Sequence, residues 1–130
     1  MKKKSIWIID DDTIFKFIML KLISKTDKFD DVNTFSNGQE ALIEFKNIVS
    51  LNEKLPDIIL LDIEMPVMDG WGFMSEVNRI KKNHKELKTS IFMSSSSIAF
   101  DDQLKADENP DIMGYLAKPI TLDDLIKIAS

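Results

Sequence analysis

The sequence predicts an α/β fold in which a parallel sheet of five strands is covered by helices on both faces. Short apolar runs alternate along the chain with segments whose apolar residues recur every three or four positions. Such runs are typical of buried parallel strands, and the second spacing is typical of the helices that connect them. Successive β-α units favour a doubly wound sheet with right-handed crossovers.

The first half of the chain predicts two strands that alternate with two helices. The apolar run over residues 6–9 predicts a buried strand. Residues 31–35 predict a second strand nearer an edge, because they carry more polar side chains. A helix is predicted between them from four apolar residues at helical spacing, Ile14, Phe17, Ile18 and Leu22. Residues 41–49 predict a second helix after the turn residues Asn37 and Gly38.

Three further strands and three further helices are predicted after Pro56. In chain order they are strand 57–61, helix 71–80, strand 90–93, helix 98–108, strand 113–117 and helix 122–129. The chain has no internal repeat and no low-complexity segment. Because 130 residues are enough for one domain with a proper core, we expect a single domain over 1–130.

The composition excludes several classes of protein. Apolar residues make up 44% of the chain and charged residues 30%, which is ordinary for a globular protein. The formal charge is −5 and the basic run over residues 2–4 is short and terminal, so direct nucleic-acid binding is not expected. The lack of cysteine excludes disulfides and thiolate metal sites. No apolar stretch has the length of a membrane span, and residues 10–12 interrupt any signal-peptide core, so we expect a cytoplasmic protein.

Ionisable residues stand where three of the predicted strands end. Asp10, Asp11 and Asp12 follow the first strand, Asp62 closes the third, and Lys118 follows the fifth. The carboxyl ends of parallel strands meet at one edge of a sheet, and ligands bind in the crevice there. The sequence therefore predicts a small pocket of carboxylates with one ammonium group beside it. Such a pocket suits a divalent cation next to a phosphoryl group.

Several short motifs lie at or near the predicted strand ends. In chain order they are Ile8-Ile9-Asp10-Asp11-Asp12, Asn37-Gly38-Gln39-Glu40-Ala41-Leu42, Pro56-Asp57, Leu60-Leu61-Asp62-Ile63-Glu64-Met65-Pro66, Met68-Asp69-Gly70, Met93-Ser94-Ser95 and Tyr115-Leu116-Ala117-Lys118-Pro119. Each motif alone is weak, but their order is highly specific. The chain resembles the receiver domain of two-component response regulators over nearly its whole length. This resemblance implies a flavodoxin-like sheet with strand order 2-1-3-4-5.

The resemblance implies a role for each ionisable residue of the predicted pocket. Asp62 would be the phosphoacceptor, because a carboxylate can attack phosphorus once the charge on the phosphoryl oxygens is neutralised. Asp10 and Asp11 would hold Mg²⁺ together with Asp62 and the backbone carbonyl of Glu64. Lys118 would pair with a phosphoryl oxygen as a point charge. Positioning and charge neutralisation would then dominate the transfer.

The resemblance also implies a two-state switch. Ser94 would move to hydrogen-bond the phosphoryl group, and Tyr115 would turn inward into the space that Ser94 leaves. The peptide bond between Lys118 and Pro119 would be cis. The chain would therefore act as a signalling switch rather than as an enzyme that turns over an external substrate.

The surface expected to change is formed by helix 98–108, strand 113–117 and helix 122–129. Its apolar residues are Ile98, Phe100, Leu104, Tyr115 and Ile120. The expected partners are a sensor histidine kinase or a histidine phosphotransfer protein, a downstream protein bound through this surface, and a second copy of the chain on activation. Nucleic acid and membrane are not expected as partners, and no output domain is expected within the chain.

Some of these residues also have a purely structural interpretation. Taken alone, three consecutive aspartates would fit a solvated turn or a helix cap, and Asp12 is expected to be the cap. Residues 95–97 are expected to serve loop geometry and helix capping. Trp71 and Met74 are expected in the core, and His84, within a charged stretch, at an exposed helix end.

Two other functions stay open. One is a pseudo-receiver, an interaction module of the same fold that never accepts a phosphoryl group. Such modules usually lack an acidic-pair residue, the acceptor or the lysine, whereas this chain keeps all of them. The other is a phosphatase with an aspartyl nucleophile on a similar sheet. Its motif would place a second aspartate two residues after the nucleophile at the first strand, as Asp12 follows Asp10, but the better framed carboxylate is Asp62 on the third strand.

Overall fold

The computed structural model describes residues 2–96 and 100–130, and its strands form one parallel sheet. The strands are β1 (Lys4–Ile9), β2 (Phe29–Phe35), β3 (Ile58–Asp62), β4 (Ser90–Ser95) and β5 (Ile112–Ala117). They are ordered β2-β1-β3-β4-β5, and each neighbouring pair is parallel. The helices are α1 (Thr13–Thr26), α2 (Gly38–Ser50), α3 (Gly70–Asn83), α4 (Phe100–Glu108) and α5 (Leu122–Ile128). The predicted fold class and strand order are confirmed.

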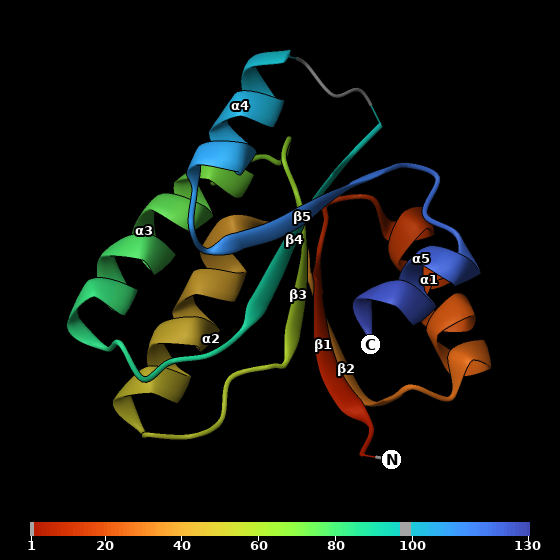
Figure 1. Ribbon diagram of the computed structural model, residues 1–130, viewed down its shortest axis with the longest axis horizontal. Helices are drawn as coiled ribbons and strands as arrows, with labels where there is room; N and C mark the ends of the chain where they lie inside the picture. The colour runs from red at the N-terminus through yellow and green to blue at the C-terminus, as the bar shows by residue number, and fades with distance from the viewer. Residues whose placement is uncertain (1, 97–99) are drawn as a thin grey trace.

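Helices cover both faces of the sheet, as Figure 1 shows with the strands seen between them. Helices α2 and α3 lie on one side, and α1 and α5 lie on the other, in agreement with two separate core clusters. Along β1, Trp7 and Ile9 belong to the first cluster, while Ile6 and Ile8 belong to the second. Because successive side chains of a strand point to opposite faces, the continuous apolar run of β1 fills both clusters.

The predicted helices and strands are all present, with shifted ends. β1 and β2 begin two residues before their predicted starts, at Lys4 and Phe29. Asp57, predicted as the first residue of the third strand, instead lies just before β3. Its Oδ2 accepts a 2.9 Å hydrogen bond from the backbone amide of Ser5, which ties the amino end of β3 to β1. The predicted start of the fourth helix, Ile98, lies outside the described residues.

The face of helix α1 that packs on the sheet differs from the one expected from the sequence. Ile14, Phe17 and Ile18, which helped to predict this helix, are exposed by 72%, 58% and 48%. The buried face is instead a second apolar stripe, which consists of Phe15, Met19, Leu22, Ile23 and Thr26. Both stripes have helical spacing, so periodicity predicts the helix but not which stripe packs on the sheet.

Polar contacts join α3 to the segment from α4 to β5. Trp71, predicted in the core, is only partly buried, because its Nε1 donates a 3.0 Å hydrogen bond to Oδ1 of Asp102 on α4. Met74 is buried as predicted. One turn further, Asn78 donates hydrogen bonds to the side chains of Asn109 and Asp111. These contacts hold α4 and the segment that follows it against α3.

No helix among residues 2–96 and 100–130 is long and apolar enough to cross a bilayer.

Candidate functional site

Three carboxylates meet at the carboxyl end of the sheet. β1 and β3 are neighbours in the sheet, with Ile9 opposite Leu61. The next residues along the chain are Asp10 and Asp62, so these two lie side by side. The carboxylate oxygens of Asp10, Asp11 and Asp62 all lie within 4.8 Å of one another. Asp10 is 1% exposed and Asp62 7%, whereas Asp11 is exposed. The predicted convergence of these residues is therefore present.

The carboxylates lie in an open pocket of about 420 Å³. Its lining consists of Asp10, Asp11, Asp12, Asp62, Glu64, Ser95, Ser96 and Lys118. The residues come from the ends of β1, β3, β4 and β5, which explains how positions far apart in the sequence share one site.

Lys118 reaches the acidic cluster from the end of β5. Its Nζ lies 2.7 Å from Oδ2 of Asp10 and 3.4 Å from Oδ1 of Asp62. The backbone amide of Lys118 donates a 2.9 Å hydrogen bond to the carbonyl of Ser95, which anchors the lysine at the end of β4. The peptide bond between Lys118 and Pro119 is cis, as predicted. One ammonium group thus faces two of the three carboxylates.

The charges of the pocket are not balanced. Burial, together with the negative charge of Asp10, raises the pKa of Asp62 to about 6, although Lys118 acts in the opposite direction. Burial alone would lower the pKa of Lys118, but the hydrogen bond and the charge of Asp10 outweigh it and the pKa is raised. The pocket therefore has excess negative charge, and this charge is carried by carboxylate oxygens. Oxygen atoms are the ligands that hard divalent cations prefer. The residues present therefore fit such a cation.

Asp12 has a structural role that separates it from its two neighbours. It is the N-cap of α1, where its Oδ1 accepts hydrogen bonds from the backbone amides of Ile14 at 2.9 Å and Phe15 at 3.1 Å. The amide of Asp12 in turn donates to Oδ1 of Asp10 at 2.9 Å. The prediction of a cap at Asp12 is confirmed, and this cap fixes the backbone that carries Asp10 and Asp11.

Two backbone features shape the loop between β3 and α3. The amide of Gly70 donates a 2.8 Å hydrogen bond to the carbonyl of Ile63, and a Cβ at this glycine would lie 2.5 Å from the carbonyl oxygen of Asp62. Val67 has φ 69°, and the amide of Met68 donates to the carbonyl of Pro66 across it, which makes a γ-turn. Neither feature was predicted from the sequence, although Asp69-Gly70 is a recognisable turn signal.

The hydroxyl groups of Ser94 and Tyr115 are buried without a hydrogen-bond partner among the described residues. Ser94 pairs with Asp62 in the register of β3 and β4, so it stands beside the pocket. Tyr115 lies one strand further out, where burial and the charge of Asp102 raise its pKa. Buried hydroxyls normally find partners, and an unpartnered one marks a site that a ligand or a movement can satisfy.

Some predicted residues lie elsewhere. His84 is the C-cap of α3, and its Nδ1 lies 3.5 Å from Glu86, in agreement with an exposed helix end. Ile120, predicted on the surface beside α4, is 6% exposed because it packs with the cluster under α5, so that assignment is wrong. Leu104 is exposed by 42%, as a surface residue requires. Ile98, Ser97 and the side chain of Phe100 lie outside what the structure describes.

A family model described as response regulator receiver domain matches residues 6–130. Among curated proteins, a protein-glutamate methylesterase/protein-glutamine glutaminase of Syntrophomonas wolfei is 33% identical over 128 residues, which are 96% of this chain. The chain spans 33% of the length of that relative.

Solved structures with the same fold include a two-component response regulator from Cytophaga hutchinsonii. It is 27% identical with a TM-score of 0.87, and the match covers 98% of this chain and 95% of the other. A CheY from Borrelia burgdorferi, solved with CheX, BeF3 and Mg, is 26% identical with a TM-score of 0.74 and coverages of 95% and 84%. With the matched family model and the acidic strand ends described above, the chain belongs to the receiver domain family of two-component response regulators.

Proposed function

We propose that this chain is a phosphorylation-activated switch that accepts a phosphoryl group on Asp62 in the presence of Mg²⁺. The observation that carries the proposal is the cluster of Asp10, Asp11 and Asp62 with the ammonium of Lys118 2.7 Å from Asp10. Membership of the receiver family supports the class of function. The roles of the individual residues rest on their positions in this pocket.

Asp10, Asp11 and Asp62 would hold the metal, together with the backbone carbonyl of Glu64. This donor set supplies only oxygen, and Asp11 would coordinate the ion directly while Asp10 acts partly through water, because Mg²⁺ takes few direct carboxylates and keeps several waters. When bound, the cation would neutralise charge on the phosphoryl oxygens. The raised pKa of Asp62 supports this assignment, because a cation beside it would return the carboxyl group to the ionised form.

In the transfer, an oxygen of the ionised Asp62 attacks phosphorus and forms the new O–P bond. The bond from phosphorus to the donor breaks on the opposite side, and the donor leaves with the electron pair. Lys118 lies 3.4 Å from Asp62, so its ammonium group can shift from Asp10 to an incoming phosphoryl oxygen. This shift stabilises charge only after the phosphoryl group has arrived.

The response to phosphorylation would run through the two unpartnered hydroxyls. Ser94 is buried beside Asp62, so a small movement brings its hydroxyl to a phosphoryl oxygen. Tyr115 would then settle in the space behind it, and the surface formed by α4, β5 and α5 would change. The proposed partners are a sensor histidine kinase or a histidine phosphotransfer protein, and a downstream protein that binds this surface.

The chain is proposed to act by contact with proteins rather than by turnover of an external substrate. The methylesterase named above is a longer protein, and the present chain matches a third of it. A pseudo-receiver that binds partners without phosphorylation is the competing function, and it would need none of the pocket chemistry.

Intact-mass analysis after incubation with acetyl phosphate and Mg²⁺ tests the proposal. The wild type should gain one phosphoryl adduct that requires Mg²⁺, and Asp62→Asn should gain none. Asp57→Asn is the matched control, because Asp57 lies just before the other end of β3 and should leave the adduct intact. Absence of an adduct in the wild type, with no response to beryllofluoride, would favour the pseudo-receiver.

A further inference from the structure

The ammonium group of Lys118 has an aromatic neighbour that none of the motifs contains. Its Nζ lies 4.2 Å from the centroid of the Phe15 ring, on the first turn of α1. Phe15 is partly buried and packs against the core cluster under α1 and α5. Its backbone amide donates to the cap residue Asp12 at 3.1 Å, so the ring is held from both its backbone and its packing.

The ring completes the surroundings of the ammonium group. Lys118 has three N–H donors, and the carboxylates of Asp10 and Asp62 lie at 2.7 Å and 3.4 Å. The face of an aromatic ring is negative, and it attracts a cation most strongly where both are removed from water. The Lys118 side chain is only 17% exposed. Phe15 therefore occupies a side of the ammonium group that water would otherwise solvate.

Such a contact matters because a lysine side chain is long and flexible. Its four-carbon stem has many rotamers, so each hydrogen bond of the ammonium group must offset a loss of conformational entropy. In the proposed transfer the ammonium group moves from Asp10 toward a phosphoryl oxygen near Asp62. Phe15 lies on α1, so the position of its ring depends on neither carboxylate. The ring can therefore stay in contact with the ammonium group throughout the transfer.

We propose that Phe15 is a positioning residue, which holds the ammonium group of Lys118 at the mouth of the pocket before and during phosphoryl binding. This inference rests on the proposed function, since it concerns the same lysine. It goes further by assigning a role to an aromatic side chain of α1. The competing explanation is that Phe15 only fills space under α1.

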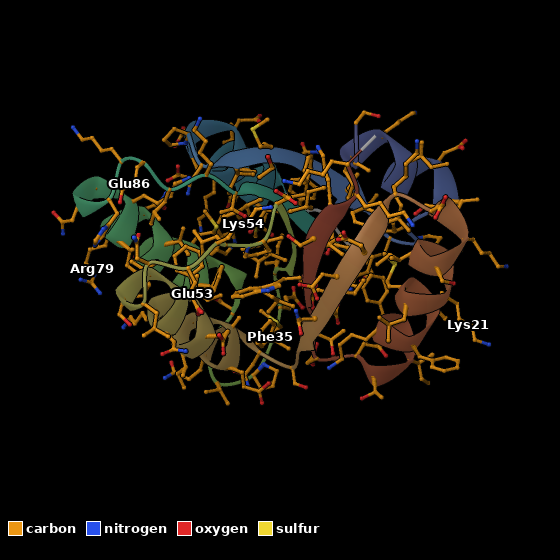
Figure 2. The ribbon with its side chains drawn as sticks, turned by 90° about the horizontal axis from the view of Figure 1, so that it is seen from below. Lys21, Phe35, Glu53, Lys54, Arg79 and Glu86 are labelled. Carbon is orange, nitrogen blue, oxygen red and sulfur yellow. The ribbon has the colours of Figure 1, made fainter. Side chains whose placement is uncertain are left out.

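Four variants separate positioning from packing. Phe15→Leu keeps an apolar side chain but removes the ring, and Phe15→Trp restores a ring of stronger cation affinity. Phe17→Leu is the matched control, because Phe17 lies on the same helix with Lys21 4.8 Å over its ring, exposed and away from the pocket. Figure 2 shows Lys21 on the outer side of α1. Lys118→Met supplies the background for a double-mutant cycle with Phe15→Leu.

The measurements are the rate of phosphorylation by acetyl phosphate and the affinity for beryllofluoride, both with Mg²⁺. Phe15→Leu should lower each by about three- to tenfold, in keeping with a partly desolvated cation–π contact. Phe15→Trp should recover most of the loss, and Phe17→Leu should match the wild type. In the Lys118→Met background, Phe15→Leu should have no further effect, because no ammonium group remains to be held.

The inference is overturned if Phe15→Leu behaves as the wild type, or if its loss is the same with and without Lys118. A loss that Phe15→Trp fails to recover, with unfolding free energies that fall in parallel, would assign Phe15 to packing alone. Failure of the proposed function would look different, since the wild type itself would then take up neither phosphoryl group nor beryllofluoride.

Discussion

The indole Nε1 of Trp71 donates a 3.0 Å hydrogen bond to Oδ1 of Asp102 and so links the start of α3 to the first turn of α4. Lys105 on the same helix places its Nζ 5.5 Å over the indole ring. The charge of Asp102 also reaches Tyr115, whose buried hydroxyl has no partner among the described residues. One carboxylate thus connects Trp71 with the residue proposed to report the state of Asp62.

This connection predicts that Trp71 reports activation by its fluorescence. Beryllofluoride with Mg²⁺ should change the emission of the wild type, because a movement of α4 alters the hydrogen bond and the cation beside the indole. Trp71→Phe should lose the change. Trp7→Phe should keep it, since Trp7 is 4% exposed in the core and contacts Phe35 and Phe45 instead. A change that persists in Trp71→Phe would show that α4 is not the element that responds.

A second prediction concerns the glycine behind the phosphoacceptor. Gly70→Ala should destabilise the fold by about 1–3 kcal/mol, because its Cβ would lie 2.5 Å from the carbonyl oxygen of Asp62 and the backbone must shift. Gly72→Ala is the matched control on the same helix, and its Cβ would meet the flexible side chain of Met68 at 3.0 Å. It should be neutral, or stabilising by up to about 1 kcal/mol through helix propensity. Urea unfolding measures both. Equal effects would mean that the loop relaxes freely around Gly70.

A third prediction follows from the γ-turn at Val67. A β-branched residue at φ 69° is strained by roughly 1–3 kcal/mol, whereas asparagine is enriched several-fold among the non-glycine residues that adopt positive φ. Because Val67 is 83% exposed, little packing is lost on replacement, so Val67→Asn should raise the free energy of unfolding by about 1 kcal/mol. The reverse change, Asn52→Val at φ 55°, should lower it by a similar amount. Thermal or urea unfolding of the two variants would contradict the idea if both shifted in the same direction.

The helices, the strands and the acidic pocket could be predicted from the sequence alone. Apolar runs and helical spacing are local signals, and each strand or helix carries its own. Asp10, Asp11, Asp62 and Lys118 follow strand ends, so the topology of a parallel sheet alone brings them to one edge. Their convergence needs no knowledge of individual side-chain packing.

What could not be predicted depends on contacts between distant segments. α1 carries two apolar stripes of equal spacing, and only the sheet decides that Phe15 and Met19 face inward while Phe17 faces out. The contact of Phe15 with Lys118 joins opposite ends of the chain. Trp71 combines an apolar ring with a donor, so hydrophobicity placed it in the core, whereas the hydrogen bond to Asp102 keeps it partly exposed.

The two carboxylates at the ends of β3 should have opposite effects on stability. Asp62 has its pKa raised from 3.8 to about 6 by burial and by Asp10, so the native state binds its proton more tightly than the unfolded chain does. Its contribution to stability therefore falls as the pH rises from about 4 to 6 and stays unfavourable above that range. For Asp57, burial acts to raise the pKa, but the backbone hydrogen bond from Ser5 and the charge of Lys54 outweigh it and the pKa is lowered. Its contribution is favourable at neutral pH and is lost as the pH falls through its pKa.

Without metal, at pH 7.5, Asp62→Asn should therefore raise the free energy of unfolding by up to about 3 kcal/mol, since the shift is about two pKa units and each unit corresponds to about 1.4 kcal/mol. Asp57→Asn should lower it by about 1 kcal/mol, because a carboxylate that accepts an amide hydrogen bond is lost. Urea unfolding in EDTA at pH 7.5 and at pH 4 measures both. The difference for Asp62→Asn should shrink at the lower pH, whereas that for Asp57→Asn should largely persist at pH 4, because the pKa of Asp57 is lowered from 3.8. A stabilisation by Asp62→Asn that is the same at pH 4 would contradict the electrostatic cause. If Asp62→Asn were destabilising at pH 7.5, the excess negative charge of the pocket would not destabilise the metal-free native state, and a bound cation would have no such repulsion to neutralise.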